Sequence, residues 1–270
     1  MARENCGREN GVSGKVYIVG AGPGDPELLT LRAARILRRA GVVLHDALVS
    51  AEVLGLAARD AVRIDVGKRC GQKLLTQEDI NALLIAYARS YEVVVRLKGG
   101  DPAIFGRTGE EITALRDAGV QFEIVPGITA SIAAAAAAGI SLTDRRRASQ
   151  VLLMTMHRGA GGADFRLDGV STDTTIAIYM PGPDYALVAE RLREAGWPGD
   201  MPCAIVSNVS RENQKIRATQ LGRLAEEEAL AAPALILVGR VVAGDADAFA
   251  AGWVEAVMAE RLGWRSGAAE

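Results

Sequence analysis

Short runs of β-branched and aliphatic residues alternate with longer amphipathic stretches through the first half of the sequence. Each run is bounded by Gly, Pro or charged residues, which is typical of buried strands. The stretches between them carry apolar residues at helical spacing. Alternation of this kind predicts an α/β domain with a parallel sheet. The predicted strands are residues 15–19, 42–44, 62–66, 92–95 and 122–125.

Capping residues mark where several helices of this half begin and end. Thr30 is the expected N-cap of a helix that runs to Arg39. Thr76 and Asp79 resemble a capping box, with Asp in place of the usual Glu or Gln. Further helices are predicted over residues 51–57, 109–118 and 131–138.

The spacing of the elements changes from about Gln150 onwards. Strands are predicted at 151–156, 174–180, 203–207, 216–219 and 234–238, with helices only at 184–194 and 221–231. This closer spacing predicts a second domain with a mixed sheet. The predicted organisation is a flexible tail at 1–13, an N-terminal domain at 14–138, a linker at 139–149, a C-terminal domain at 150–242 and a terminal helix or tail at 243–270.

Three predicted strands of the first half end in unusual loops, at residues 20–26, 67–71 and 99–102. Glycine lets the backbone turn sharply and lets a ligand approach the main chain without a Cβ in the way. The carboxyl ends of parallel strands meet at one edge of a sheet, so these loops are expected to line one ligand site. Ordinary strand-to-helix turns are the alternative for each loop taken alone.

A dinucleotide-binding fold is one candidate for the loop at 20–26. Glycines at alternating positions follow a strand, and Asp46 ends the next strand at roughly the spacing of that fingerprint. The fingerprint needs glycine at position 25, which is Asp, and Pro26 follows it. A pyrophosphate would therefore face a carboxylate and no helix N-terminus, which disfavours this fold.

Composition narrows the function classes. The 270 residues carry a formal net charge of −2 and 4% aromatic residues, which disfavours a nucleic-acid partner. The three cysteines are far apart and there are two histidines, so neither a disulfide framework nor a metal site is expected. No apolar run is long enough to cross a membrane and the N-terminus is polar, so we expect a cytoplasmic protein.

Three motifs, taken together, resemble those of the tetrapyrrole methyltransferase family. They are VGAGPGDPELLTL at 19–31, RLKGGDPAIFGR at 96–107 and VPGITA at 125–130. The resemblance covers about residues 14–242. More selective pieces at 66–69, 77–81 and 107–111 are similar to the uroporphyrinogen-III C-methyltransferase branch of the family.

The resemblance implies two α/β domains with an active-site cleft between them, and a homodimer. It also implies S-adenosylmethionine as the cofactor, with S-adenosylhomocysteine as its product. Glycine loops suit this cofactor because they expose main-chain donors and acceptors to its polar groups. The implied cofactor contacts are Pro23, Gly99, Gly100, Asp101, Ile104, Thr129, Ala130 and Met180.

The resemblance further implies which side chains handle protons. It places a proton acceptor at Asp46 and a proton donor at Lys68, both at carboxyl ends of predicted strands. A carboxylate can take a proton, and burial can prepare a lysine to give one. The structural alternative is that Asp46 caps the following helix and that Lys68 pairs with a surface acid.

The implied reaction is methylation of uroporphyrinogen III at C2 and C7, through precorrin-1 to precorrin-2, for sirohaem or cobalamin synthesis. The substrate is a polycarboxylate, so arginines are expected around it. The candidates are Arg69, Arg107 and Arg145, with Lys98 and Arg146 behind them, and a solvated surface charge is the alternative for each.

The sequence departs from the family pattern at several positions. Ala47 stands where Arg is usual, Asp144 where His is usual, and Thr108 where Gly is usual. One alternative is a sister methyltransferase acting on a later corrin precursor, which the selective pieces disfavour. The other is a non-catalytic ligand-binding protein on the same scaffold, which would have no need of Asp46 and Lys68.

Overall fold

The computed structural model describes residues 14–67, 75–156 and 166–243. The chain divides into two compact units, Met1–Ala130 and Ser131–Glu270. The predicted tail at 1–13 and nearly all of the one at 243–270 lie outside the described residues.

The first unit is built on a five-stranded sheet in which all neighbouring strands are parallel. The strand order is β3-β2-β4-β1-β5. This confirms the parallel sheet that the sequence predicted. The strands are β1 (Lys15–Gly20), β2 (Val42–His45), β3 (Val62–Asp65), β4 (Val93–Lys98) and β5 (Gln121–Val125).

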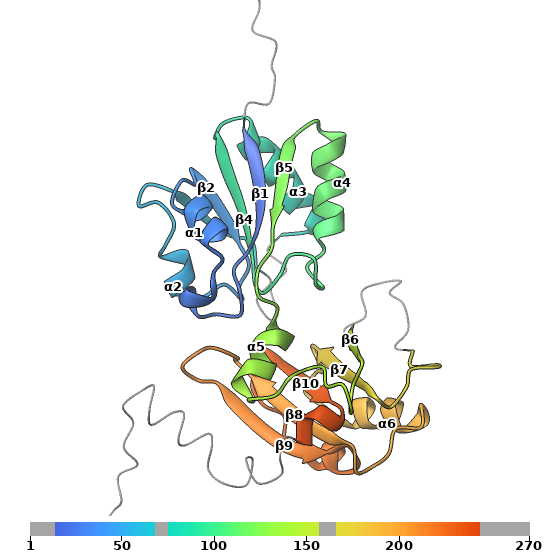
Figure 1. Cartoon of the computed structure of the whole chain (residues 1–270). Helices are drawn as coiled ribbons and strands as arrows, with labels where there is room; N and C mark the ends of the chain where they lie inside the picture. Colours follow the sequence, from blue (N-terminus) through green and yellow to red (C-terminus); the bar gives the residue numbers. More distant parts are fainter. Residues whose placement is uncertain (1–13, 68–74, 157–165, 244–270) are drawn as a thin grey trace, which may run out of the picture. The chain divides into compact units, whose positions relative to one another are not determined.

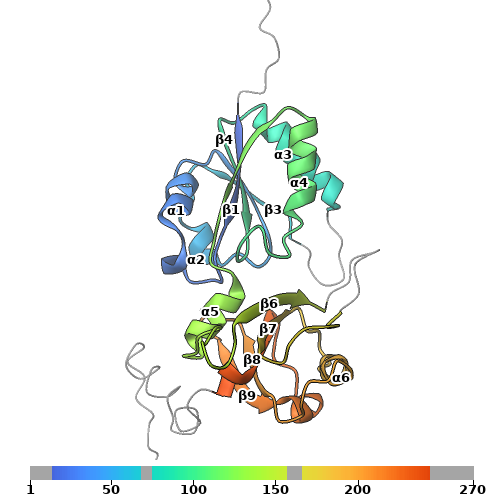
Figure 2. The ribbon, with the colours of Figure 1, turned by 45° about the vertical axis from the view of Figure 1, so that its right-hand side comes forward.

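Helices cover both faces of this sheet (Figures 1 and 2). One apolar layer joins the sheet to α1 (Leu31–Leu37) and α2 (Ala51–Leu54). The other joins it to α3 (Gln77–Ala88) and α4 (Thr108–Asp117). Successive strand residues alternate between the layers, because side chains along a strand point to opposite faces.

Local capping explains where these helices start. Thr30 accepts a hydrogen bond from the N–H of Ala33 at 3.1 Å. Thr76 and Asp79 cap each other's backbone as predicted. Asp25 accepts from the N–H of Glu27 and begins a 3-10 turn, η1 (Pro26–Leu28), where a dinucleotide fold would begin a helix. The backbone here therefore agrees with the argument against that fold.

The second unit holds a mixed sheet of five strands in the order β6-β7-β10-β8-β9. Strands β6 and β7 are parallel, and the other neighbours are antiparallel. This confirms the predicted mixed sheet. Its strands are β6 (Gln150–Thr155), β7 (Thr174–Tyr179), β8 (Pro202–Ser207), β9 (Lys215–Gln220) and β10 (Ala234–Val238).

One predicted helix of this unit is wrong, and one element lies elsewhere than expected. Helix α6 (Ala186–Glu194) forms, but 221–231 holds only the 3-10 turn η2 (Leu221–Glu226). Leu221 and Leu224 are both fully buried three residues apart, a spacing that a 3-10 turn keeps on one side. Helix α5 (Ala130–Ala137) falls almost wholly in the second unit, where the N–H of Ser131 donates to the Tyr179 hydroxyl at 3.0 Å.

Candidate functional site

The loops after β1 and β4 are joined at the carboxyl edge of the parallel sheet. The N–H of Gly22 donates to the carbonyl of Gly100 at 3.1 Å, and the N–H of Gly100 donates back to Gly22 at 2.7 Å. Both glycines have positive φ, +68° and +67°, which is the region where glycine carries no steric penalty. The sequence placed these two loops at one edge, and the structure brings them into direct contact.

A third loop, after β5, packs against the same backbone. A Cβ placed on Gly20 would lie 2.6 Å from the nitrogen of Gly127 and 2.7 Å from the carbonyl oxygen of Gly100. A Cβ on Gly127 would lie 2.4 Å from that same oxygen. Only glycine at positions 20 and 127 lets the three loops approach this closely.

Asp101 ties these loops together. One carboxylate oxygen accepts from the N–H of Gly127 at 2.9 Å, and the other accepts from the N–H of Ala103 at 2.7 Å. A Cβ on Gly100 would be 3.8 Å from the Cα of Thr129 and 3.9 Å from the nitrogen of Ala130. Asp101, Gly100, Thr129 and Ala130 were each predicted to contact the cofactor, and all four are neighbours here.

The remaining predicted cofactor residues are more widely spread. Pro23 is buried in the β1 loop, while Gly99 and Ile104 are half-buried in and after the β4 loop. Met180 belongs to the second unit, follows β7 directly and is 45% exposed. Its φ of +50° is uncommon for a residue with a side chain, and such backbone strain is enriched at functional sites.

Asp46 lies at the end of β2, next to β4. Its N–H donates to the carbonyl of Leu97 at 3.2 Å, and its Oδ1 accepts from Nη2 of Arg96 at 2.5 Å. The side chain remains 29% exposed. The following helix α2 is capped by Ser50, whose hydroxyl accepts from the N–H of Val53. The carboxylate of Asp46 therefore bonds to Arg96, whereas the structural alternative gave it the capping role.

Three charged side chains are buried beside Asp46: Arg96, Lys98 and Glu111. Nε of Arg96 donates to Glu111 at 2.9 Å, and Nζ of Lys98 donates to its two oxygens at 3.0 and 3.2 Å. Burial acts to lower the pKa of Arg96, but the carboxylates of Asp46 and Glu111 outweigh it and raise that pKa. Burial lowers the pKa of Lys98, and the charge of Arg96 adds to this effect.

The predicted substrate-binding residues differ in their placement. Lys98 was a secondary candidate, and this prediction is wrong because the side chain is 3% exposed and bound to Glu111. Arg107 is exposed and forms two hydrogen bonds of 2.7 Å to Glu110, one to each carboxylate oxygen. Arg145 is exposed in the second unit. Lys68 and Arg69 lie outside the described residues.

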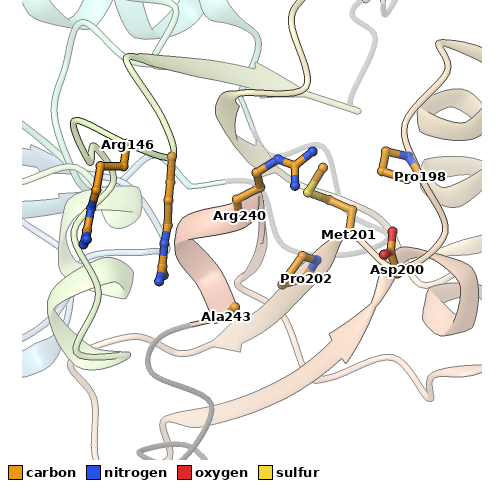
Figure 3. A pocket seen from close by; sticks show the side chains of 8 residues that line it. Arg146, Pro198, Asp200, Met201, Pro202, Arg240 and Ala243 are labelled. Carbon is orange, nitrogen blue, oxygen red and sulfur yellow. The ribbon is translucent and has the colours of Figure 1, made fainter.

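Arg146, the other secondary candidate, lines a pocket of about 680 Å³ in the second unit. Figure 3 shows Arg146 on one side of this pocket and Asp200 on the other, with Arg240 and Met201 between them. The Arg146 side chain is 83% exposed. Nε of Arg240 lies 3.4 Å from Oδ1 of Asp173. These are surface charges of the kind that usually contribute little energy.

Sequence reasoning missed the part that Glu111 and Arg96 take in the site. A signal was present in each case. Glu111 falls on the same helical stripe as Thr108 and Leu115, all buried, so a charged residue occupies the apolar face of α4. Arg96 and Lys98 alternate with Leu97 along β4, which places both cations on the face that α4 covers.

The described residues hold neither a cluster of metal-ligating side chains nor a membrane-spanning helix. Within the three described ranges, no group of three or more His, Cys, Asp or Glu side chains could hold a metal ion. None of the helices found there is long and apolar enough to span a membrane.

Comparison with known proteins places the chain in a family. The model of the tetrapyrrole (corrin/porphyrin) methylases matches residues 15–225. The chain belongs to this family and is therefore a methyltransferase by class. The three loops described above lie within the matched region.

Curated relatives are named siroheme synthases. The one from Hahella chejuensis is 44% identical over 234 residues, which is 85% of this chain and 50% of the relative. One from Escherichia coli O139:H28 is 45% identical over 232 residues, again 85% and 50%. The chain thus spans about half the length of the curated relatives it matches.

Solved structures support the same placement. Uroporphyrin-III C-methyltransferase from Thermus thermophilus, in complex with S-adenosylhomocysteine, has a TM-score of 0.73 and 38% identity, covering 85% of this chain and 99% of that one. A cobalt precorrin-4 methyltransferase has a TM-score of 0.71 and 28% identity, covering 88% and 99%.

Proposed function

We propose that this protein methylates uroporphyrinogen III at C2 and C7, giving precorrin-2 by way of precorrin-1, with S-adenosylmethionine as the methyl donor. One observation carries the proposal. The glycine loops after β1, β4 and β5 lie at the carboxyl edge of the parallel sheet, and Asp46 lies at the same edge. Asp46 is a partly exposed carboxylate that a buried arginine holds. A relative that is 44% identical is named a siroheme synthase, and a solved structure that is 38% identical is named a uroporphyrin-III C-methyltransferase.

The residues present fit S-adenosylmethionine. Gly20, Gly100 and Gly127 bring three loop backbones into contact, and Gly99 and Gly100 remain partly exposed beside them. Such a surface suits the amine and carboxylate of a methionine moiety, which need backbone acceptors and donors. Gly99, Gly100 and Asp101 would hold that end, and Thr129 and Ala130 would contact the rest. Pro23, Ile104 and Met180 complete the proposed set.

The bound donor supplies a methyl group on a sulfonium, which is already activated for transfer to an electron-rich pyrrole carbon. The protein therefore needs no nucleophile, and its contribution is in-line positioning and proton handling. Arg96 occupies Oδ1 of Asp46, so we assign Oδ2 as the oxygen that accepts the proton released after methylation. Lys68 is the proposed donor of a proton to the substrate.

Arginines are proposed to hold the substrate carboxylates. Arg107 would exchange Glu110 for a carboxylate of the substrate, which costs little because both side chains are about half exposed. Arg69 and Arg145 are the other proposed contacts. We also propose that the two units enclose an active-site cleft and that the protein acts as a cytoplasmic homodimer without a metal ion.

The alternative is methylation of a later corrin precursor. It is supported by the similarity to cobalt precorrin-4 methyltransferase, whose TM-score is close to that of the uroporphyrin enzyme. The lower identity, 28% against 38%, favours uroporphyrinogen III.

The test is the mass of the product after anaerobic incubation with uroporphyrinogen III and S-adenosylmethionine. We expect a gain of two methyl groups, and no gain when the methyl donor is left out. An unchanged tetrapyrrole, from protein that still binds S-adenosylhomocysteine, would contradict the proposed substrate. The same assay with a later corrin precursor then separates the alternative from an inactive protein.

A further inference from the structure

The guanidinium of Arg96 is fixed at both ends. At one end Nε donates to Glu111 at 2.9 Å, and at the other Nη2 donates to Asp46 at 2.5 Å. Between them Nη1 donates to the backbone carbonyls of Leu97 at 3.3 Å and Leu44 at 3.5 Å. The side chain is 3% exposed, so water does not compete for these bonds.

We infer that Arg96 is a positioning residue for Asp46, and that Glu111 and Lys98 hold Arg96 in place. The inference rests on the proposed function, in which Asp46 accepts the proton. Arg96 fixes one oxygen of the Asp46 carboxylate, and the Asp46 side chain stays 29% exposed. Its bond to the Leu44 carbonyl also fixes the end of β2, from which Asp46 projects.

Glu111 is well placed to hold Arg96 because several contacts hold Glu111 itself. It is fully buried and accepts from Lys98 on both oxygens. Gln77 on α3 donates to it as well, at 3.5 Å. Arg96 therefore links helix α4, through Glu111, to the end of β2.

Stability alone is a weak reason for this arrangement. Two cations and two carboxylates balance in charge, but burying Arg96, Lys98 and Glu111 has a desolvation cost that well-packed apolar residues would not have. A planar arginine fork, by contrast, fixes direction, which a lysine cannot do. The buried cluster lies beside Asp46, the partly exposed carboxylate that the proposed mechanism uses. The direction of that carboxylate matters because it must accept a proton from the substrate.

Arg96→Lys tests the inference because it keeps the charge and removes the fork. We expect kcat for uroporphyrinogen III methylation to fall about tenfold to a hundredfold, as small misplacements of catalytic groups do. KM and the Kd for S-adenosylhomocysteine should stay within about twofold. Glu111→Gln should lower kcat in the same way but less, because Lys98 and Arg96 lose their shared carboxylate.

A double-mutant cycle separates positioning from general damage. In an Asp46→Asn background, measured in single-turnover incubations, Arg96→Lys should cost little further activity because the group it positions is already disabled. The matched control is Glu123→Gln, which removes a carboxylate from a different ion pair of the same sheet. It should leave kcat unchanged.

Each outcome bears on a distinct claim. A loss from Arg96→Lys that is equal in both backgrounds, or that follows a matching fall in Tm and cofactor affinity, overturns the positioning role. Undiminished kcat overturns it as well. A wild-type protein that methylates no tetrapyrrole overturns the proposed function instead, and it is recognised before any variant is made.

Discussion

The two five-stranded sheets of this protein differ in where their charges lie. Among the described residues, Arg96 and Lys98 of the parallel sheet are buried together with Glu111 of α4, the helix that covers them. In the mixed sheet, the buried polar side chains of the described part are neutral, such as Thr175 and Ser207. Burying charged groups costs desolvation free energy, even when they are paired. The parallel sheet therefore carries a desolvation cost that the mixed sheet does not.

Topology explains why the charges gather in one sheet. All five strands of the parallel sheet end at the same edge, so their loops meet and can build one site. The antiparallel pairs of the mixed sheet send successive ends to opposite edges. The parallel sheet therefore gathers its loops and buried charges where we propose the site, whereas the centre of the mixed sheet is apolar packing.

The largest expected effect on stability comes from the centre of the mixed sheet. Ile236 is fully buried on β10, which pairs with both β7 and β8. Ile236→Ala should lower the free energy of unfolding by about 2–5 kcal/mol, from lost burial and the cavity left behind. Urea unfolding measures this loss. Methylation per folded molecule should not change. A tenfold fall in kcat would contradict the view that the centre of the mixed sheet serves stability and not catalysis.

A smaller cost in stability, joined to a loss of binding, is expected at the edge of the parallel sheet. Gly20→Ala places a Cβ 2.6–2.7 Å from backbone atoms of Gly100 and Gly127, which must then move apart. We expect destabilisation of about 1–3 kcal/mol and a Kd for S-adenosylhomocysteine raised more than tenfold, measured by calorimetry. Gly109→Ala is the control, since nothing lies within 4 Å of its added Cβ. Equal affinity in the two variants would contradict the proposal that the glycine loops bind the cofactor.

The smallest effect is expected from the ion pair between Lys15 and Glu123. The hydrogen bond from Lys15 lowers the pKa of the Glu123 carboxyl, so the pair stabilises the fold above the ordinary glutamate pKa of about 4.3. That stability is lost as the pH falls through the lower folded pKa. Glu123→Gln should cost about 0.2–1 kcal/mol near neutral pH.

The pH dependence of this cost provides the check. Urea unfolding of wild type and Glu123→Gln should give curves that converge well below about pH 4, where the carboxyl is protonated in both states. A difference that persists or grows in acid would mean that the substitution acts through packing and not through charge.

Much of the fold followed from local signals in the sequence. Thr30 and Thr76 begin helices because their side chains cap free N–H groups, which is a property of a few adjacent residues. The strands were found from short apolar runs for the same reason. Residues 221–231 were mistaken for a helix because the burial of Leu221 and Leu224 by the second core decides their spacing, and no local signal records it.

The site divided in a similar way. The glycine loops stand in contiguous motifs, and the structure brings them together as predicted. The contact of Glu111 with Arg96 joins a helix to a strand, so it depends on the packing of α4 against the sheet. Arg96 and Lys98 extend β4 beyond the predicted strand, which hid their burial. The roles proposed for Asp46, Lys68 and all the other site residues remain predictions.

We propose that the carboxyl edge of the parallel sheet is the active centre, with Asp46 as its proton acceptor. The most direct test is to measure turnover and S-adenosylhomocysteine affinity together for Asp46→Asn, an isosteric change at a partly exposed side chain. We expect a Kd within about twofold of wild type and turnover reduced by at least about a hundredfold. Undiminished turnover with intact binding would contradict it.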